Sequence, residues 1–416
     1  MEMNVPPLLG NDAPTPPLPQ SKPGSGRRLF AIVLSLFLVI FLVDAAISSL
    51  DDLLILAFDC HALSVLRALL AIATLLICVV IYILIGLTPM VPKRFFLPLP
   101  LFILASMLAL VPLMTFFYSR LQQAALVTSL CQLALGMFIW RRAQGSLKFC
   151  WPLITAEHLG ARGFSWSHVS IFALLNLFVL LPLVAIYLFV SSACAVNHFS
   201  EGFMTLHPSG FTVQARKYIR DDGKVIELFP MAHVAEPDFY RNVTRAFPTN
   251  SIILMEGVSD DGNLLTNKIS YKRMARTLGL AEQKQTFVPT NSNHAVTADV
   301  DVGQFSKETL DFLNLVMLIH SKGATAENVM KFMEWSPPPD FEKQLFDDIL
   351  IKRNEHLLQE IQSHLRQSDN LMVPWGVAHM PGIAREIQKS GFHLAETHDY
   401  FVIRFGKAQD KKTSPK

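Results

Sequence analysis

The chain has 416 residues, which would suit two or three average domains, but its composition is not that of a wholly soluble protein. Apolar residues make up 51% and charged residues only 17%, whereas soluble domains usually carry about 25% charged residues. The formal net charge of +2 excludes a strongly basic nucleic-acid-binding protein and an acidic solvating tail.

Charge and cysteine are divided unevenly along the chain. Residues 1–199 hold 11 Lys and Arg and 7 Asp and Glu, and residues 200–416 hold the other 25 and 27. All five cysteines lie in the first half, so the second half is neither a disulfide scaffold nor a cysteine-ligated zinc domain. Cys60 and Cys194 are either a pair or, as we favour, small apolar filler residues.

The first half predicts a membrane region. Residues 1–26 are rich in Pro, Gly and Ser and predict a disordered cytoplasmic tail. Residues 27–197 contain five apolar runs of about the 20 residues that a helix needs to cross a lipid bilayer, and the fourth run is the weakest because it contains three glutamines. These runs are residues 29–50, 68–92, 95–119, 121–140 and 169–200.

The orientation follows from the short loops between these runs. With the N-terminus in the cytoplasm, the inner segments hold nine Lys and Arg, whereas the outer loops hold only Arg67 and Arg120. This distribution satisfies the positive-inside rule. Five spans then place everything after about residue 197 in the periplasm or outside the cell, and losing the fourth span would reverse that prediction.

The predicted spans are nearly free of ionisable residues, which are typical of transport pathways. Asp44 is close to the outer end of the first run, so we expect it at the membrane interface. The first half therefore predicts a membrane anchor, and a transporter or sensor with an accessory outer domain is the less favoured hypothesis.

The second half predicts one α/β domain with a mixed sheet over residues 200–406, followed by a disordered basic tail at 407–416. Strands are expected at 210–215, 224–229, 251–255, 371–375 and 400–405, and helices at 236–246, 271–278, 307–321, 342–366 and 383–390. Alternating strands and helices are typical of this fold class.

Two segments of this domain repeat one order of elements. The segment from Val225 through His233 and the segment from Leu371 through His379 both read as strand, turn and His, followed by a helix and another strand. This pattern predicts an internal duplication that presents two histidines at strand ends, where sites form. The alternative is that each histidine is a structural hydrogen-bond partner.

Carboxylates and one arginine are the other candidates. Glu256 ends a buried strand before a glycine, which suits a metal ligand, a general base or a salt bridge to a neighbouring Arg. Asp299 and Asp301 alternate on an extended segment and are either oxygen ligands for Mg²⁺ or Mn²⁺ or, as we favour, solvated loop carboxylates. Arg353 lies on a helix and either clamps a carboxylate or an oxyanion or, more commonly, is a surface charge.

These residues also carry a resemblance. Gly376-Val-Ala-His379 is followed by Met-Pro-Gly-Ile, Arg353-Asn354 lies on a helix, and Glu256 ends a strand. In this order, residues 223–405 resemble the TraB/TIKI/GumN family, within the wider grouping of ChaN and erythromycin-esterase-like proteins. The first motif departs from the family pattern, because Pro230 stands where the family has Gly.

The resemblance implies a divalent-metal-dependent hydrolase of peptidase type. His233, His379 and Glu256 would be the metal ligands, Glu256 would be a ligand or the base, and Arg353 would stabilise the oxyanion. The implied metal is Mn²⁺ or Co²⁺, and the implied partner is a peptide or protein substrate. Other branches of the family imply an alternative, which is a non-catalytic, membrane-anchored module that binds or sequesters a peptide signal.

Overall fold

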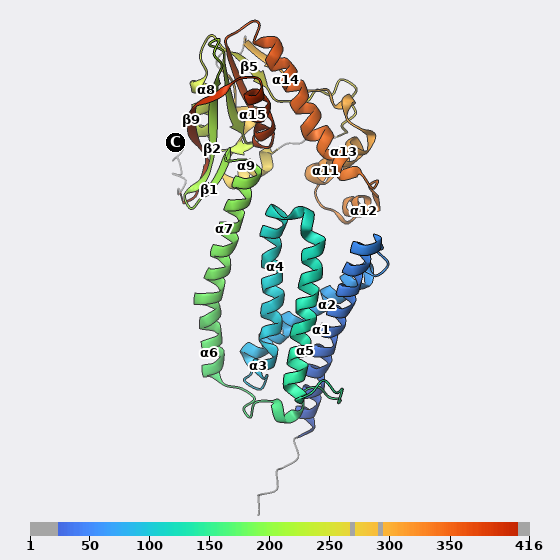
Figure 1. Cartoon of the computed structure of the whole chain (residues 1–416). Helices are drawn as coiled ribbons and strands as arrows, with labels where there is room; N and C mark the ends of the chain where they lie inside the picture. Colours follow the sequence, from blue (N-terminus) through green and yellow to red (C-terminus); the bar gives the residue numbers. More distant parts are fainter. Residues whose placement is uncertain (1–23, 267–270, 290–293, 407–416) are drawn as a thin grey trace, which may run out of the picture. The chain divides into compact units, whose positions relative to one another are not determined.

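The computed structural model describes residues 24–266, 271–289 and 294–406. The chain forms two compact units whose boundary falls between Ile186 and Tyr187 (Figure 1). The predicted disordered tails lie almost wholly outside the described residues, except that Ser25 and Gly26 already belong to the first helix.

Five helices of the described chain are long and apolar enough to cross a membrane, one for each of the five predicted spans. The fourth predicted span, the weakest in the sequence, is one of these helices, because its three glutamines interrupt the apolar run without breaking the helix. The spans are α1 (Ser25–Phe58), α2 (Ser64–Leu87), α3 and α4 (Lys93–Phe96 and Pro98–Phe116), η1 and α5 (Tyr118–Arg120 and Leu121–Gln144), and α6, η3 and α7 (Trp166–Leu175, Asn176–Leu180 and Leu181–Phe199).

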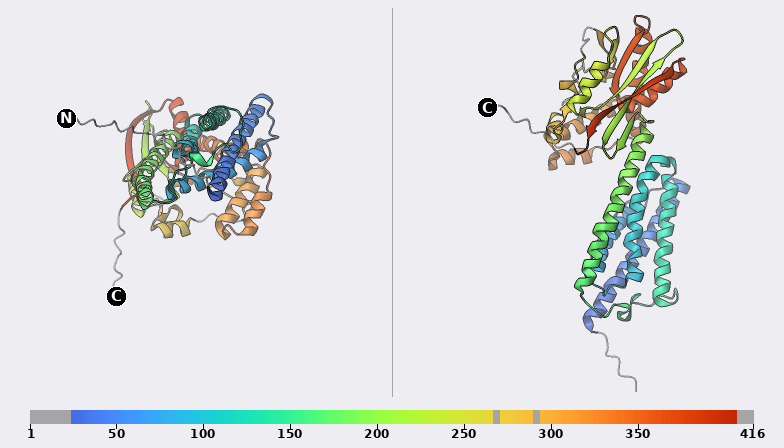
Figure 2. Two further views of the ribbon diagram at one scale, coloured as in Figure 1. Left: turned by 90° about the horizontal axis from the view of Figure 1, so that it is seen from below. Right: turned by 90° about the vertical axis from the view of Figure 1, so that its left-hand side faces the viewer.

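Helix α1 packs against both α2 and α5 in the membrane unit (Figure 2). The helices approach closely at Gly136, where a Cβ atom would lie 2.6 Å from Leu42. Large apolar side chains such as Leu69 remain exposed on the bundle, as lipid-facing residues do. All five cysteines are free. Cys60 is half-buried and Cys194 is exposed, so neither the predicted pair nor a filler residue in the core is found at these two positions.

Asp44, which the sequence predicts at the membrane interface, faces the interior of the bundle. It is only 4% exposed and accepts a hydrogen bond from Gln132 of α5. Because α1 continues to Phe58, Asp44 lies well inside the helix and on the side that packs against α5.

The second unit contains a mixed sheet of seven strands within the described residues, as predicted. Four strands are parallel in the order β3, β8, β5, β7, while β1 and β9 pair antiparallel with β2, which joins β3. The strands are β1 (Met204–His207), β2 (Gly210–Ile219), β3 (Val225–Met231), β5 (Ile252–Met255), β7 (Ala295–Thr297), β8 (Asn370–Gly376) and β9 (His393–Arg404). A small second sheet pairs β4 (Val234–Ala235) with β6 (Ala281–Glu282).

Helices cover both faces of the sheet, because successive side chains of a strand point to opposite sides. On β8, Leu371, Val373 and Trp375 pack in one core with α14 (Lys352–His364) and α15 (Met380–Lys389). Met372 points the other way, into a core with α8 (Pro237–Ala246). Figure 1 shows α14 and α15 on one side of the strands and α8 on the other.

The remaining helices refine the sequence-based boundaries. The long helix predicted at 342–366 is continuous but contains a π-helical stretch, so it divides into α13 (Phe341–Phe346), η6 (Asp347–Ile351) and α14. The others are α9 (Lys272–Leu278), α10 (Gln283–Thr286), α11 (Lys307–Lys322) and α12 (Ala326–Glu334), with short 3-10 turns η2 (Ala156–His158), η5 (Val302–Gln304) and η7 (Val377–His379).

The two segments that carry the histidines share their order of elements but not their sheet positions. After His233 and α8 the chain enters β5, which is parallel to β8. After His379 and α15 it enters β9, which runs antiparallel to β2.

Candidate functional site

The carboxyl ends of four adjacent parallel strands deliver the candidate residues to one edge of the sheet. His233 follows β3, His379 follows β8, Glu256 directly follows β5, and Asp299 follows β7. Met231 and Gly376 are register partners, so the ends of β3 and β8 coincide. In open α/β sheets, ligands bind at this edge.

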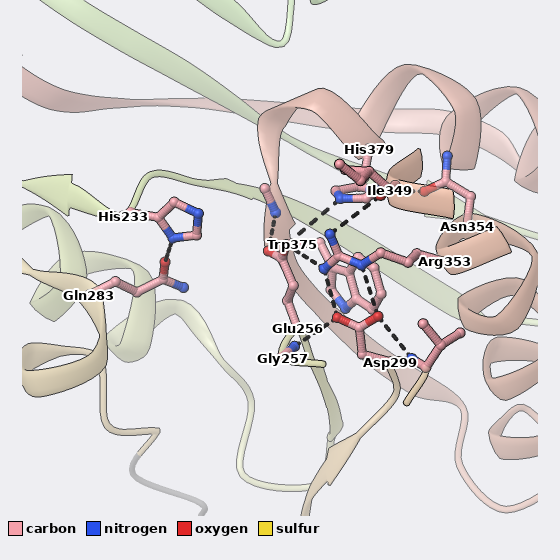
Figure 3. A network of polar contacts seen from close by, with 12 residues as sticks. His233, Glu256, Gly257, Gln283, Asp299, Ile349, Arg353, Asn354, Trp375 and His379 are labelled. Atoms are coloured by element: carbon pink, nitrogen blue, oxygen red, sulfur yellow. Dashed lines mark hydrogen bonds and ion pairs between the residues drawn. The ribbon is translucent and has the colours of Figure 1, made fainter. Parts of the chain in front are cut away.

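Arg353 connects two of these strand ends (Figure 3). Its Nη2 donates to Oε1 of Glu256 at 2.9 Å and to Oδ2 of Asp299 at 2.7 Å, and its Nε donates to Oδ1 of Asp299 at 3.0 Å. The side chain is only 12% exposed, so the interpretation as a surface charge is wrong. Burial opposes the charge, but the two carboxylates raise the pKa of Arg353 above its usual value.

Glu256 is held at both of its oxygens. Oε1 accepts from Arg353, and Oε2 accepts the backbone N–H of Gly376 at 2.6 Å. A Cβ atom on Gly376 would lie 3.3 Å from Oε2, a tight contact that would move the carboxylate by a few tenths of an ångström. The salt bridge to an Arg, one of the alternatives for Glu256, is confirmed.

The two aspartates that follow β7 have different surroundings. Asp299 is 8% exposed and accepts from Arg353 and from the N–H of Gly257, so its interpretation as a solvated loop carboxylate is wrong. Asp301 accepts from the Ser259 hydroxyl and from the N–H groups of Asp261 and Gly303, and it stabilises that turn rather than joining the Arg353 cluster.

His379 completes the cluster from the end of β8. Its Nδ1 lies 2.7 Å from Oδ1 of Asn354, so Nδ1 carries the hydrogen and the lone pair of Nε2 faces Oε1 of Glu256 at 3.7 Å. Burial, and next the charge of Arg353, lower the pKa of His379 to about 4. The ring is therefore neutral at pH 7, and its contact with Glu256 is not an ion pair.

His233 lies apart from this cluster, as Figure 3 shows. The ring is exposed, stacks on Tyr271 at 4.9 Å between centroids, and places Nδ1 3.3 Å from Oε1 of Gln283. Burial, and next the negative charge of Glu256, raise the pKa of Tyr271. The phenol that stacks on His233 is therefore close enough to Glu256 to interact with it electrostatically.

The set of three residues implied by the family resemblance does not fit a metal site in this structure. Within residues 24–266, 271–289 and 294–406, no three His, Cys, Asp or Glu side chains are arranged to hold a metal ion. Separated by 3.7 Å, Nε2 of His379 and Oε1 of Glu256 suit two ligands of one ion with bonds near 2 Å. However, His233 contacts Gln283 instead, and Arg353 already supplies a cation to Glu256.

Sequence reasoning found Glu256, Arg353 and His379 but missed how they are positioned. The signals for Asn354 and Asp299 were present, since Asn354 follows Arg353 and Asp299 lies just beyond a strand. The contacts of Asn354 with His379 and of Asp299 with Arg353 depend on the strand order β8, β5, β7. The spacing of residues along the chain does not reveal that order. The contribution of Gly376 is a backbone N–H, which residue type alone does not reveal.

Comparisons with known proteins found no family model, curated protein or solved structure that matches the chain. The resemblance to the TraB/TIKI/GumN family therefore stays a prediction, and the geometry of the site carries the functional argument.

Proposed function

We propose that the C-terminal unit is a hydrolase of peptidase type, anchored in the lipid bilayer and held outside the cytoplasm. The observation that supports this proposal is the contact between Nε2 of His379 and Oε1 of Glu256. Both atoms are acceptors, and neither can donate to the other over their 3.7 Å separation. A water molecule that donates to both atoms would be positioned and polarised at this point.

In this proposal His379 is the general base. Its neutral ring can accept a proton from the water at Nε2, while Asn354 fixes the tautomer through Nδ1. The carboxylate of Glu256 would stabilise the imidazolium that forms, as the carboxylate of a catalytic triad does.

Arg353 is assigned a positioning role rather than direct stabilisation of an oxyanion. Its donors are directed at Glu256, Asp299 and the carbonyl of Ile349. The guanidinium therefore holds Glu256 in place and compensates the two carboxylates.

Cleavage of a peptide library tests the hydrolase. The full-length protein in detergent micelles would be incubated with proteome-derived peptides, and new termini would be identified by mass spectrometry. We expect cleavage that falls at least 100-fold in His379→Gln and Glu256→Gln, a loss typical of removing a general base. His393→Gln, at an exposed histidine of β9, is the matched control and should cleave normally. Equal cleavage by His379→Gln would overturn the proposal.

The metal dependence implied by the resemblance is a separate hypothesis. It would require His233 to leave Gln283 and Tyr271, which it contacts in this structure. Calorimetric titration with Mn²⁺, Co²⁺ or Zn²⁺ tests it, and binding that is lost in both His233→Ala and His379→Ala would support it. Cleavage that persists in His233→Ala and after chelation would reject it.

A peptide-binding regulator is the second candidate. The observation that favours it is that the charges of Arg353, Glu256 and Asp299 are already paired with one another, which suits a rigid binding surface. This candidate predicts that library peptides are retained intact, and that their retention survives both chelation and His379→Gln.

A further inference from the structure

The fifth span meets the rest of the membrane unit along a short stretch of α2. Phe172 of α6 packs on Gly86, where a Cβ atom would lie 2.5 Å from the phenyl ring, and on Tyr82, with 5.1 Å between the ring centroids. The hydroxyl of Tyr82 donates to Oδ1 of Asn176 at 2.5 Å, and Nδ2 of Asn176 donates to the carbonyl of Phe172 at 2.8 Å. The polar side chains at this contact therefore satisfy each other.

Beside this contact lies an open groove of about 290 Å³ between α2, α4 and the fifth span. Leu101 of α4 lines one wall, and Leu175, Val179 and Leu183 of the fifth span line the other. These three side chains are each more than half exposed, so protein does not fill the groove. Because the hydrocarbon region of a bilayer holds no water to fill it, an apolar groove at this depth is filled by apolar chains.

The groove lining also includes one cation, Lys93, at the start of the third span. Its Nζ lies 3.3 Å from Nδ1 of His168, and Nε2 of His168 lies 2.7 Å from the carbonyl oxygen of Ile85 near the end of α2. The residue four positions after Ile85 is Pro89, which has no N–H, so the helix leaves that carbonyl without a backbone donor. His168 supplies the donor, and its ring is thereby held beside Lys93.

The charge of Lys93 is available to a ligand. The side chain is exposed, and no carboxylate among the described residues forms an ion pair with it. In the predicted orientation this end of the groove faces the cytoplasmic leaflet, which carries anionic lipids, and basic pockets between spans on that side bind anionic headgroups. A lysine ammonium is a point charge that suits a phosphate group.

We propose that this groove binds one anionic phospholipid, with an acyl chain along the apolar walls and the phosphate on the ammonium of Lys93. A zwitterionic lipid fits less well, because its headgroup brings a second cation close to Lys93 and the groove lining has no carboxylate to receive it. The bound lipid then fills the space between α4 and the fifth span, the helix that leads into the C-terminal unit.

Native mass spectrometry of the full-length protein released from detergent micelles tests this site. Dioleoyl phosphatidylglycerol and dioleoyl phosphatidylcholine, which carry the same chains, would be offered in equal amounts. We expect the wild type to retain about fivefold more phosphatidylglycerol, the factor that one lysine near a membrane surface supplies, and Lys93→Gln to lose this preference. Lys148→Gln is the matched control, because this exposed lysine after α5 does not line the groove, and it should keep the preference.

A second pair of variants tests the apolar walls and serves if Lys93→Gln fails to fold. Val179→Trp fills the groove and should lower the retention of both lipids, whereas Leu130→Trp, at an exposed position of α5, should not. Equal retention of the two lipids by the wild type would overturn the proposal, and so would an equal loss of preference in Lys93→Gln and Lys148→Gln. Unchanged retention in Val179→Trp would also reject it, since the lipid then binds elsewhere.

Discussion

At the scale of single residues, one guanidinium allows two carboxylates to be buried at adjacent strand ends. The side chain of Asp299 is fully buried and that of Glu256 is 13% exposed, and Arg353 bridges them. A buried ion pair adds little to the free energy of unfolding compared with apolar residues of the same size. Removing one member of the pair is costly, because the other charge then stays buried without compensation.

Replacing the guanidinium should therefore be costly. We expect Arg353→Met to lower the free energy of unfolding by about 3–5 kcal/mol, because Asp299 and Glu256 then remain buried without a cation. Thermal unfolding in micelles, followed by tryptophan fluorescence, would measure this loss. Lys389→Met is the control, since its side chain is 71% exposed and pairs with Glu386 on the surface of α15, and it should cost less than about 0.5 kcal/mol. Equal costs would contradict the assigned role of Arg353.

His379 should make the protein sensitive to acid. Its pKa is lowered to about 4 from a usual value of 6.5, so between these pH values the unfolded chain binds a proton that the folded chain excludes. Stability due to this group is complete above pH 6.5 and decreases as the pH falls, by up to about 3 kcal/mol at 1.36 kcal/mol per pKa unit.

Unfolding at pH 7 and pH 4.5 measures this dependence. The loss of stability between the two pH values should be smaller in His379→Gln than in the wild type, because glutamine does not titrate. His393→Gln should behave like the wild type, since this histidine is exposed on β9. The same loss in all three proteins would show that other groups cause the acid sensitivity.

The sequence predicts which residues reach the sheet edge better than how they are oriented there. The position of Glu256 after an apolar strand and of His379 after a second strand is readable, because strand patterns and turns are local. The orientation of His233 depends on Tyr271 and Gln283, which come from α9 and α10 through tertiary packing. No local pattern encodes that contact.

At the scale of secondary structure, β2 joins the antiparallel and parallel parts of the sheet. It pairs with β1, β3 and β9, and its first residue is Gly210. Gly210 has a φ of 143°, and a Cβ atom there would lie 2.0 Å from the carbonyl oxygen of Ile403. The pairing of β2 with β9 therefore requires a glycine at this point.

Gly210→Ala should weaken this pairing. We expect a loss of about 2–3 kcal/mol in the free energy of unfolding, because both the positive φ and the contact with Ile403 become unfavourable. Gly223→Ala is the matched control, since Gly223 has a φ of 83° but open space around it, and it should cost only about 1 kcal/mol. Denaturation of the two variants side by side measures the difference, and equal losses would show that the β9 contact is unimportant.

Elements with apolar patterns were predictable, and polar ones were not. The strands β3, β5 and β8 follow runs of apolar residues and match the predictions closely. For β9 the apolar pattern predicts a strand only at 400–405. The first half, from His393 to Asp399, is exposed and mostly polar, and only the repeated order of elements predicts a strand there. Its strand state comes from pairing with β2 across the domain rather than from its own composition.

At the scale of the whole molecule, an odd number of spans would place the chain ends on opposite sides of the membrane. The prediction that the N-terminus is cytoplasmic rests on the positive-inside rule. Reporter fusions in a bacterial host test it. Alkaline phosphatase at the C-terminus should be active and a fluorescent protein there dark, whereas fusions after Gly145, in the predicted inner loop, should show the reverse. A fluorescent C-terminal fusion would contradict the orientation.

The pairing of β2 with β9 also determines when the second unit can finish folding during synthesis. The partner of Gly210 is Arg404, so almost the entire domain must leave the ribosome before this part of the sheet can close. Pairing over such a separation is slow, and until it forms one edge of β2 stays open to other extended chains. If this unit is exported, it crosses the membrane with that edge unprotected. A chain truncated before His393 would retain every span and lose the means to complete its sheet.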